Sequence, residues 1–316
     1  MKKTTVLSIS VTLLWTSLAN SETTYGERLG WGPNDRVLII HCDDAGMSLA
    51  SNQGAIEALD FGLVTSVSVM MPCPWVPGFA KYVKAHPDVD VGLHLTLTSE
   101  YDWYRWMPVA GKSAVPGLVD EQGCLWDNVP LVTQHASADE VETEIRAQID
   151  RAETMGMPIT HLDSHMGTLF AKPEYFQRLV KIGIEKQIPV LLPGNISGRG
   201  LDSERVRQFR RIIDEAWAAG LPVIDYIHGD SYDWKTTDKL SHYSQAMREL
   251  KPGITEMIIH CTKPDDVIGV INGNRDHLYG DYTAMISPEL KKVVEEEGII
   301  LTTWRELKER RLRAKD

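Results

Sequence analysis

The chain alternates between short runs rich in apolar and β-branched residues and longer amphipathic segments, and this alternation constrains its fold most strongly. The apolar runs predict strands at 37–40, 65–71, 90–98, 159–165, 188–192, 223–229, 253–261 and 299–304. The segments between and after them predict helices, the clearest at 49–62, 77–87, 139–155, 173–186, 203–220, 238–250 and 288–298. Alternating strands and helices are typical of a mostly parallel sheet covered by helices.

Seven or eight such units favour a closed barrel over an open sheet. No break in composition and no linker divides the chain. We therefore expect an α/β fold with a single (β/α) barrel-like domain over residues 34–312. This domain would be TIM-barrel-like with mostly parallel strands, and irregular or seven-stranded closure is compatible with the pattern.

The composition is that of an ordinary globular protein, with 316 residues, 43% hydrophobic and 24% charged. The formal net charge of −11 argues against nucleic acid or an anionic membrane surface as a partner. Neither value indicates whether the protein forms an oligomer, and that state stays open.

The first residues have the form of a secretory signal peptide. Lys2 and Lys3 precede an apolar run at 6–18, and the small-x-small pattern Ala19-Asn20-Ser21 follows it. We expect cleavage after Ser21, which makes 1–21 the signal peptide and the mature protein exported, to the periplasm or outside the cell, without stable membrane insertion. An uncleaved anchor is the alternative, although the run is short and rich in Ser and Thr for a membrane span.

Four cysteines in an exported protein permit disulfides without requiring them. Cys42 and Cys261 each adjoin a residue assigned below to the functional site, so we expect them to lie near each other as buried free thiols. Cys73 and Cys124 fall in predicted loops, and the sequence indicates no partner for either.

The segment 36–48, RVLIIHCDDAGMS, joins a buried strand to two adjacent acids. A glycine turn at Gly46 follows, and Ser48 stands where an N-cap would open the next helix. Functional groups gather at the carboxyl ends of parallel strands, where Asp43 and Asp44 are expected. Each acid raises the cost of ionising its neighbour, and a nearby divalent cation would relieve that cost.

Two further strand ends carry histidines that can complete a metal site. In 90–98, alternation puts His94 on the polar face, which must look into the barrel or its mouth. In HLDSH, His161 and His165 share a strand face but lie roughly 13 Å apart at about 3.3 Å per residue, so one ion cannot bind both. We choose His165, at the carboxyl end, as the ligand. His161 is expected deeper, and Asp163 is expected to orient a ligand.

Imidazole and carboxylate ligands with open positions are typical of catalytic zinc. Asp44, His94 and His165 therefore predict a metal triad. Asp43 is then predicted to act as general base on a water molecule. His260, at the end of another strand, is a candidate general acid for a leaving amine. The alternative is that each residue has a separate structural role, which burial of so many polar groups makes costly.

The motifs CDDAGMS, VGLHLTLT and THLDSH, with a late strand ending in histidine, resemble those of the YdjC-like (ChbG/HpnK) carbohydrate deacetylases over residues 37–305. The resemblance implies a barrel-like fold and removal of acetyl groups from N-acetylated mono- or oligosaccharides. It also implies one divalent metal ion, zinc or magnesium, bound by Asp44, His94 and His165, with Asp43 as base and His260 as acid.

A long stretch at 99–138 is expected to be an irregular lid whose aromatics are listed here: Tyr101, Trp103, Tyr104, Trp106 and Trp126. These rings can stack on sugar or can pack in the loop's own small core, and both interpretations stay open. Two rival functions also stay open. One is a metal-dependent hydrolase of another ester or phosphoester bond, and the other is an exported, non-catalytic sugar-binding protein.

Overall fold

A computed structural model describes residues 23–196, 202–272 and 275–314 of the protein. The predicted signal peptide, residues 1–21, lies outside these described residues. Among the described residues, no helix is both long and apolar enough to cross a membrane.

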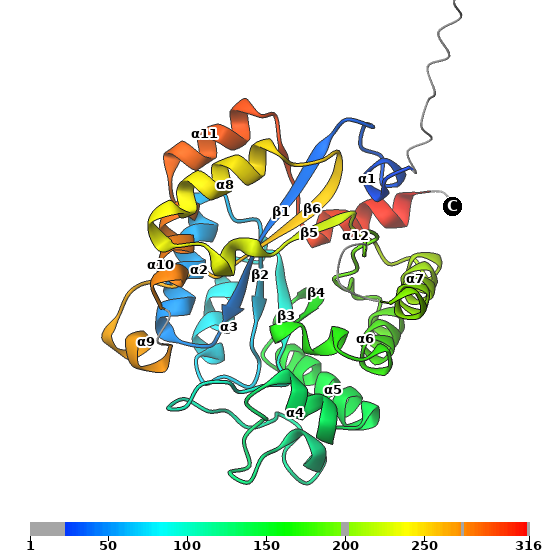
Figure 1. Cartoon of the computed structure of the whole chain (residues 1–316), viewed down its shortest axis with the longest axis vertical. Helices are drawn as coiled ribbons and strands as arrows, with labels where there is room; N and C mark the ends of the chain where they lie inside the picture. The colour runs from blue at the N-terminus through cyan, green and yellow to red at the C-terminus, as the bar shows by residue number, and fades with distance from the viewer. Residues whose placement is uncertain (1–22, 197–201, 273–274, 315–316) are drawn as a thin grey trace, which may run out of the picture.

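A curled sheet of seven strands lies at the centre of the described part of the molecule (Figure 1). Its order is β4-β3-β2-β1-β6-β5, with β7 paired to the beginning of β1, and every pairing is parallel. The strands are β1 (Arg36–Ala45), β2 (Ser66–Val69), β3 (Val91–Leu95), β4 (Ile159–Ser164), β5 (Tyr226–His228), β6 (Gly253–Ile259) and β7 (Ile300–Leu301).

The predicted strand at 188–192 is wrong as a regular strand, yet it occupies a strand's place. Isolated parallel bridges join Leu162 to Val190 and Pro193 to Ile224, so this segment carries the sheet from β4 round towards β5. Pro189 lies within it and Pro193 follows it, and proline has no N–H to donate to a ladder. The single barrel-like α/β domain is therefore confirmed, with one position in the sheet filled by an irregular segment.

Helices surround the sheet, with α2, α8, α10 and α11 on one side and α5, α6 and α7 on the other (Figure 1). The predicted cap is confirmed, because the Ser48 hydroxyl accepts a hydrogen bond from the Ser51 N–H. The described helices are α1 (Tyr25–Arg28), α2 (Leu49–Phe61), α3 (Val76–Ala85), α4 (Val129–His135), α5 (Ala138–Thr154), α6 (Pro173–Lys186), α7 (Ser203–Ala218), α8 (Lys239–Arg248), α9 (Asp266–Ile271), α10 (Arg275–Met285), α11 (Pro288–Glu296) and α12 (Trp304–Arg313).

The stretch at 99–138 is less irregular than predicted, because it contains α4 and a 3₁₀ turn at Pro116–Leu118. The Asn128 side chain caps α4 by accepting from the Leu131 N–H. A helix of only seven residues gives too few turns for an apolar period to stand out in the sequence.

The two faces of β1 show how the barrel interior is layered. Leu38, Ile40 and Cys42 face the helices and belong to the main apolar core. On the other face, Val37 and Ile39 join a smaller apolar cluster inside the amino end of the barrel, with Leu29, Trp31, Leu191, Ile224, Ile254, Trp304 and Leu307. His41 and Asp43 continue that inward face, so the interior changes from apolar to polar towards the carboxyl ends of the strands.

Candidate metal centre and active site

A bulge at the end of β1 lets two adjacent acids face one site. From Cys42 to Ala45 the chain advances three positions on β1 but only two on β2, from Val67 to Val69. Asp44 has φ 65°, in the left-handed region that non-glycine residues rarely adopt. A regular strand would point neighbouring side chains to opposite faces, so this backbone is what brings Asp44 beside Asp43. Such a conformation costs on the order of 1–3 kcal/mol and is common at functional sites.

Asp44 lies between the two predicted histidine ligands. Its Oδ1 atom is 3.5 Å from His94 Nε2 and 3.5 Å from His165 Nδ1. This buried oxygen has no hydrogen-bond partner among the described residues. Burial works against ionisation, but His165, His260 and His94 outweigh it and hold the pKa of Asp44 well below its usual range.

Each of these histidines has its second ring nitrogen held by a carboxylate. His94 Nδ1 lies 2.7 Å from Asp163 Oδ1, and His165 Nε2 lies 2.9 Å from Glu100 Oε1. Such contacts fix the tautomer and ring direction of metal-binding histidines. The orienting position predicted for Asp163 agrees with this geometry. Glu100 was missed, because it stands in the predicted lid with no periodic pattern around it.

The three side chains fit a divalent cation. One carboxylate oxygen and two imidazole nitrogens lie within 4.8 Å of one another, and the remaining nitrogen of each ring is already bonded. The unpartnered oxygen of Asp44 is a ligand atom that lacks any other role among the described residues. Two nitrogens and one oxygen suit zinc better than magnesium, which prefers oxygen ligands throughout.

Asp43 lies beside this triad and is held from below. Its Oδ1 atom is 3.1 Å from His41 Nε2 and accepts a hydrogen bond from the Ser68 hydroxyl at 3.3 Å. Its Oδ2 atom is 3.6 Å from His94 Nε2 and 3.8 Å from His260 Nε2. Asp43 therefore has one oxygen directed towards the triad and one anchored in the barrel.

His260 follows β6 and completes the group at the mouth of the barrel. Its Nε2 atom is the one that faces Asp43. Its backbone N–H donates to Asp281 Oδ2 at 3.0 Å, and Asp281 is itself held by Lys239 and Tyr243. The Tyr232 ring packs edge-on against the imidazole, with the centroids 5.6 Å apart. We call Asp43, Asp44, His94, His165 and His260 the mouth cluster.

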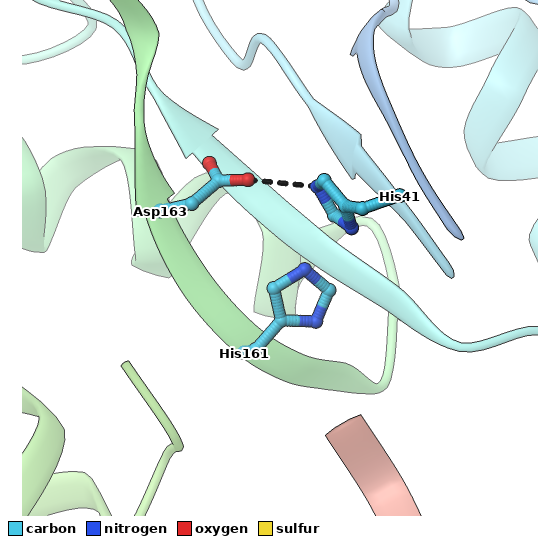
Figure 2. Close-up of side chains that lie close together, drawn as sticks. All are labelled: His41, His161 and Asp163. Carbon is cyan, nitrogen blue, oxygen red and sulfur yellow. Dashed lines mark hydrogen bonds and ion pairs between the residues drawn. The ribbon is translucent and has the colours of Figure 1, made fainter. Parts of the chain in front are cut away.

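A second polar layer lies deeper in the barrel. His161 packs against the His41 ring with centroids 4.9 Å apart, while His165 packs against His94 at 5.0 Å. The two HLDSH histidines therefore pack against different rings, and His161 lies in the deeper layer. Figure 2 shows His161 beneath the His41–Asp163 hydrogen bond. We call His41, Ser66, Ser68, His161, Asp163 and Glu256 the inner polar layer.

His41 was also missed in the sequence. It lies inside an apolar run, where a histidine gives no sign of whether it faces the core or the barrel. Only the alternation from Val37 and Ile39 would have placed it on the face of Asp43.

The lid aromatics divide between the two interpretations. Trp106 is buried and donates from its indole N–H to the Thr98 carbonyl, so it belongs to the loop's own core. Tyr104 donates its hydroxyl to the Met47 carbonyl. Trp103 is 82% exposed and is free to meet a ligand.

The predicted proximity of two cysteines is confirmed. The Cys261 N–H points to Cys42 Sγ at 3.4 Å, and both thiols are buried and free. Cys73 and Cys124 are free as well.

Comparison with known proteins agrees with this fold. The chain is 32% identical to a carbohydrate deacetylase of Thermus thermophilus, covering 90% of this chain and 97% of the relative. It is 30% identical to a chitooligosaccharide deacetylase of Yersinia enterocolitica, over 49% of this chain and 59% of the relative.

A solved structure from Enterococcus faecalis V583, named a candidate cellobiose-phosphate cleavage protein, shares the fold. It superposes with a TM-score of 0.72 at 24% identity, covering 86% of this chain and 99% of that one. The sequence profile described as YdjC-like protein matches residues 37–296. The chain therefore belongs to the YdjC-like protein family.

Proposed function

We propose that the protein is a metal-dependent hydrolase that removes acetyl groups from N-acetylated mono- or oligosaccharides. The family and the names of its relatives support a carbohydrate deacetylase. The observation that carries the proposal is the convergence of Asp44, His94 and His165 on one point, with Asp43 and His260 beside it. A sugar-binding protein without catalysis would not require an unpartnered buried carboxylate next to two oriented histidines.

Asp44 Oδ1, His94 Nε2 and His165 Nδ1 would hold the cation, and we propose zinc or a metal of similar preference. A bound divalent ion polarises a carbonyl and lowers the pKa of a water molecule. Asp163 and Glu100 keep the two imidazoles turned towards the site, so the ligand atoms need little rearrangement to bind.

Asp43 and His260 divide the proton transfers between them. Asp43 Oδ2 takes a proton from the water that attacks the amide carbon, because its other oxygen is already fixed by Ser68 and His41. His260 Nε2 then donates a proton to the departing amine. The two atoms are 3.8 Å apart, so both can reach the same reacting centre.

The decisive experiment combines elemental analysis of the purified protein with a screen of three substrate classes. N-acetylated saccharides, acetyl esters and phosphoesters are compared, with acetate, free amine and phosphate as readouts. Equal amounts of acetate and free amine from the saccharides, lost after chelation and restored by zinc, support the proposal. Hydrolysis confined to esters or phosphoesters contradicts the amide specificity, and saccharide binding without acetate release contradicts catalysis.

We also propose that the protein is exported, on the strength of residues 1–21. The mature amino terminus is then Glu22, and removal of residues 2–21 keeps the protein in the cytoplasm. Cell fractionation with amino-terminal sequencing tests this, and an intact Met1 on exported protein would indicate an uncleaved anchor.

A further inference from the structure

We infer that His41 carries a positive charge inside the barrel and acts as a positioning residue. It contacts both the base Asp43 and Asp163, and Asp163 in turn is hydrogen-bonded to His94. The role in turnover rests on the proposed function, whereas the charge and the anchoring stand on geometry alone. No part of the proposed reaction uses His41 directly.

His41 is fully buried and both of its ring nitrogens are hydrogen-bonded. Nε2 lies 2.9 Å from Asp163 Oδ2, 3.1 Å from Asp43 Oδ1 and 3.0 Å from Ser68 Oγ. Nδ1 lies 3.0 Å from Ser66 Oγ. Figure 2 shows the bond to Asp163, which reaches His41 from β4 across the barrel interior.

The neighbours of Nε2 determine that this nitrogen carries a hydrogen. The Ser68 hydroxyl donates its one hydrogen to Asp43 Oδ1, so the Ser68 oxygen is left as an acceptor towards His41. Asp163 Oδ2 and Asp43 Oδ1 are carboxylate acceptors at 2.9 and 3.1 Å from the same nitrogen. Two carboxylates so close to a buried ring favour a second hydrogen on Nδ1, which would donate to Ser66 Oγ, and an imidazole with two N–H groups is a cation.

The surrounding charges agree with this arrangement. Burial disfavours the cation, but Glu256 where it is ionised, and Asp163 and Asp43 through their hydrogen bonds to the ring, outweigh burial and raise the pKa of His41 well above its usual range. The neighbouring His161 has the opposite state, because burial and then the charge of His41 lower its pKa well below the usual range. The two buried rings meet edge to face, and a single charge on the pair avoids like-charge repulsion.

The alternative is that a metal ion, instead of a proton on His41, supplies the positive charge in the inner polar layer. His41, His161 and Asp163 offer ligand atoms within 4.8 Å of one another, and His161 Nε2 has no hydrogen-bond partner among the described residues. A metal ion there would have to displace the His41 proton from three acceptors at 2.9–3.1 Å. His41 and His161 are both fully buried, whereas Asp44 retains some exposure. We therefore assign the metal to the mouth cluster and the proton to His41.

The consequence is a shared anchor for base and ligand. Asp163 bonds His41 through Oδ2 and His94 through Oδ1, so movement of one carboxylate would turn a metal ligand. Loss of His41 would also free Asp43 Oδ1 and leave two buried carboxylates close together without a compensating charge. We expect weaker metal binding and slower turnover, with substrate affinity little changed.

The test compares His41→Asn, which keeps one amide donor, with His41→Leu, which keeps none. The matched control is Ile40→Val, an equally buried neighbour that faces the helices. Zinc affinity is measured by calorimetry without substrate, and kcat and KM are measured for acetate release. We expect zinc affinity and kcat to fall about 10- to 100-fold, with a larger fall in His41→Leu than in His41→Asn. KM should stay within about threefold of the wild-type value, and Ile40→Val should change none of the three quantities.

Nitrogen-15 NMR of histidine-labelled wild-type protein reads the charge directly and needs no activity. The His41 signals are identified as those absent from His41→Asn. This imidazole should keep both nitrogens protonated from about pH 6 to about pH 8, and Ser66→Ala should shift its Nδ1 signal. A His41 ring with only one protonated nitrogen overturns the inference, as does a second equivalent of zinc that disappears in His41→Asn. Folded His41 variants with unchanged zinc affinity also overturn it. If wild-type protein releases no acetate, the proposed function fails, but the NMR and zinc measurements still decide the role of His41.

Discussion

The mouth cluster and the inner polar layer are built from the same residue types, yet they are suited to different tasks. In the mouth cluster, His94 and His165 each keep one nitrogen near Asp44 Oδ1, which has no hydrogen-bond partner in the described chain. In the inner polar layer, both nitrogens of His41 are fully engaged by hydrogen-bond acceptors.

The difference shows that distance alone does not identify a metal site. Both groups place three ligand atoms within 4.8 Å, and each has an unpartnered atom among the described residues, Asp44 Oδ1 in the mouth cluster and His161 Nε2 in the inner polar layer. Only in the mouth cluster does that atom lie between two imidazoles whose other ring nitrogens are held by carboxylates. Leftover ligand atoms with oriented partners indicate a cation, and saturated ones indicate a fixed structural charge.

The largest effect should come from the mouth cluster itself. His165→Ala removes a ligand and should abolish bound metal and reduce acetate release to background, because two ligands hold a catalytic ion poorly. Elemental analysis and the acetate assay measure both losses. The exposed His86→Ala serves as control and should change neither. Full metal content in His165→Ala would remove this residue from the triad.

Asp43→Asn should separate catalysis from metal binding. The amide is nearly the same shape but cannot accept the proton of water, so we expect normal metal content and a fall in kcat of about 10²- to 10⁴-fold. Wild-type turnover in a metal-loaded Asp43→Asn protein would rule out Asp43 as base.

Glu100→Gln should sharpen the contrast by weakening one orienting contact. The neutral amide holds His165 Nε2 less strongly than the carboxylate at 2.9 Å, and we expect about 10- to 100-fold weaker zinc binding. Calorimetry measures the change, with the exposed Glu121→Gln of the same lid as control. Equal affinity in both variants would leave Glu100 without an orienting role.

Glu256→Gln should affect stability rather than the site. Burial raises the pKa of Glu256 from 4.5 to about 8, so the folded protein keeps a proton that the unfolded chain releases. Its folded pKa is raised, so the stabilisation is fully present below pH 4.5 and is lost as pH rises towards about 8.

As pH rises from about 6 to about 7.5, the wild type should lose about 2 kcal/mol of unfolding free energy, because the proton on Glu256 stabilises the fold less by about 1.36 kcal/mol per pH unit. Glu256→Gln should lack that loss. Urea denaturation of both proteins at the two pH values measures the difference, and parallel pH profiles would show that Glu256 is already ionised in the fold.

Much of the fold followed from local patterns. The helices at 139–155 and 173–186 appear within one residue of the structure, because an apolar period of about 3.6 with good capping acts locally. The segment at 188–192 did not form a regular strand, because Pro189 within it and Pro193 after it restrict pairing with the neighbouring strands. The four helices α1, α4, α9 and α10 were not predicted.

The sequence by itself determined which residues end the parallel strands, because strand polarity brings all carboxyl ends to one edge of the barrel. Asp43, Asp44, His94, His165 and His260 could be named from that rule. Only the tertiary structure decided that Asp44 turns inward at a bulge, that Glu100 returns from the lid to His165, and that His41 is enclosed by carboxylates. These features depend on contacts between segments far apart in the chain, and residue spacing carries no information about them.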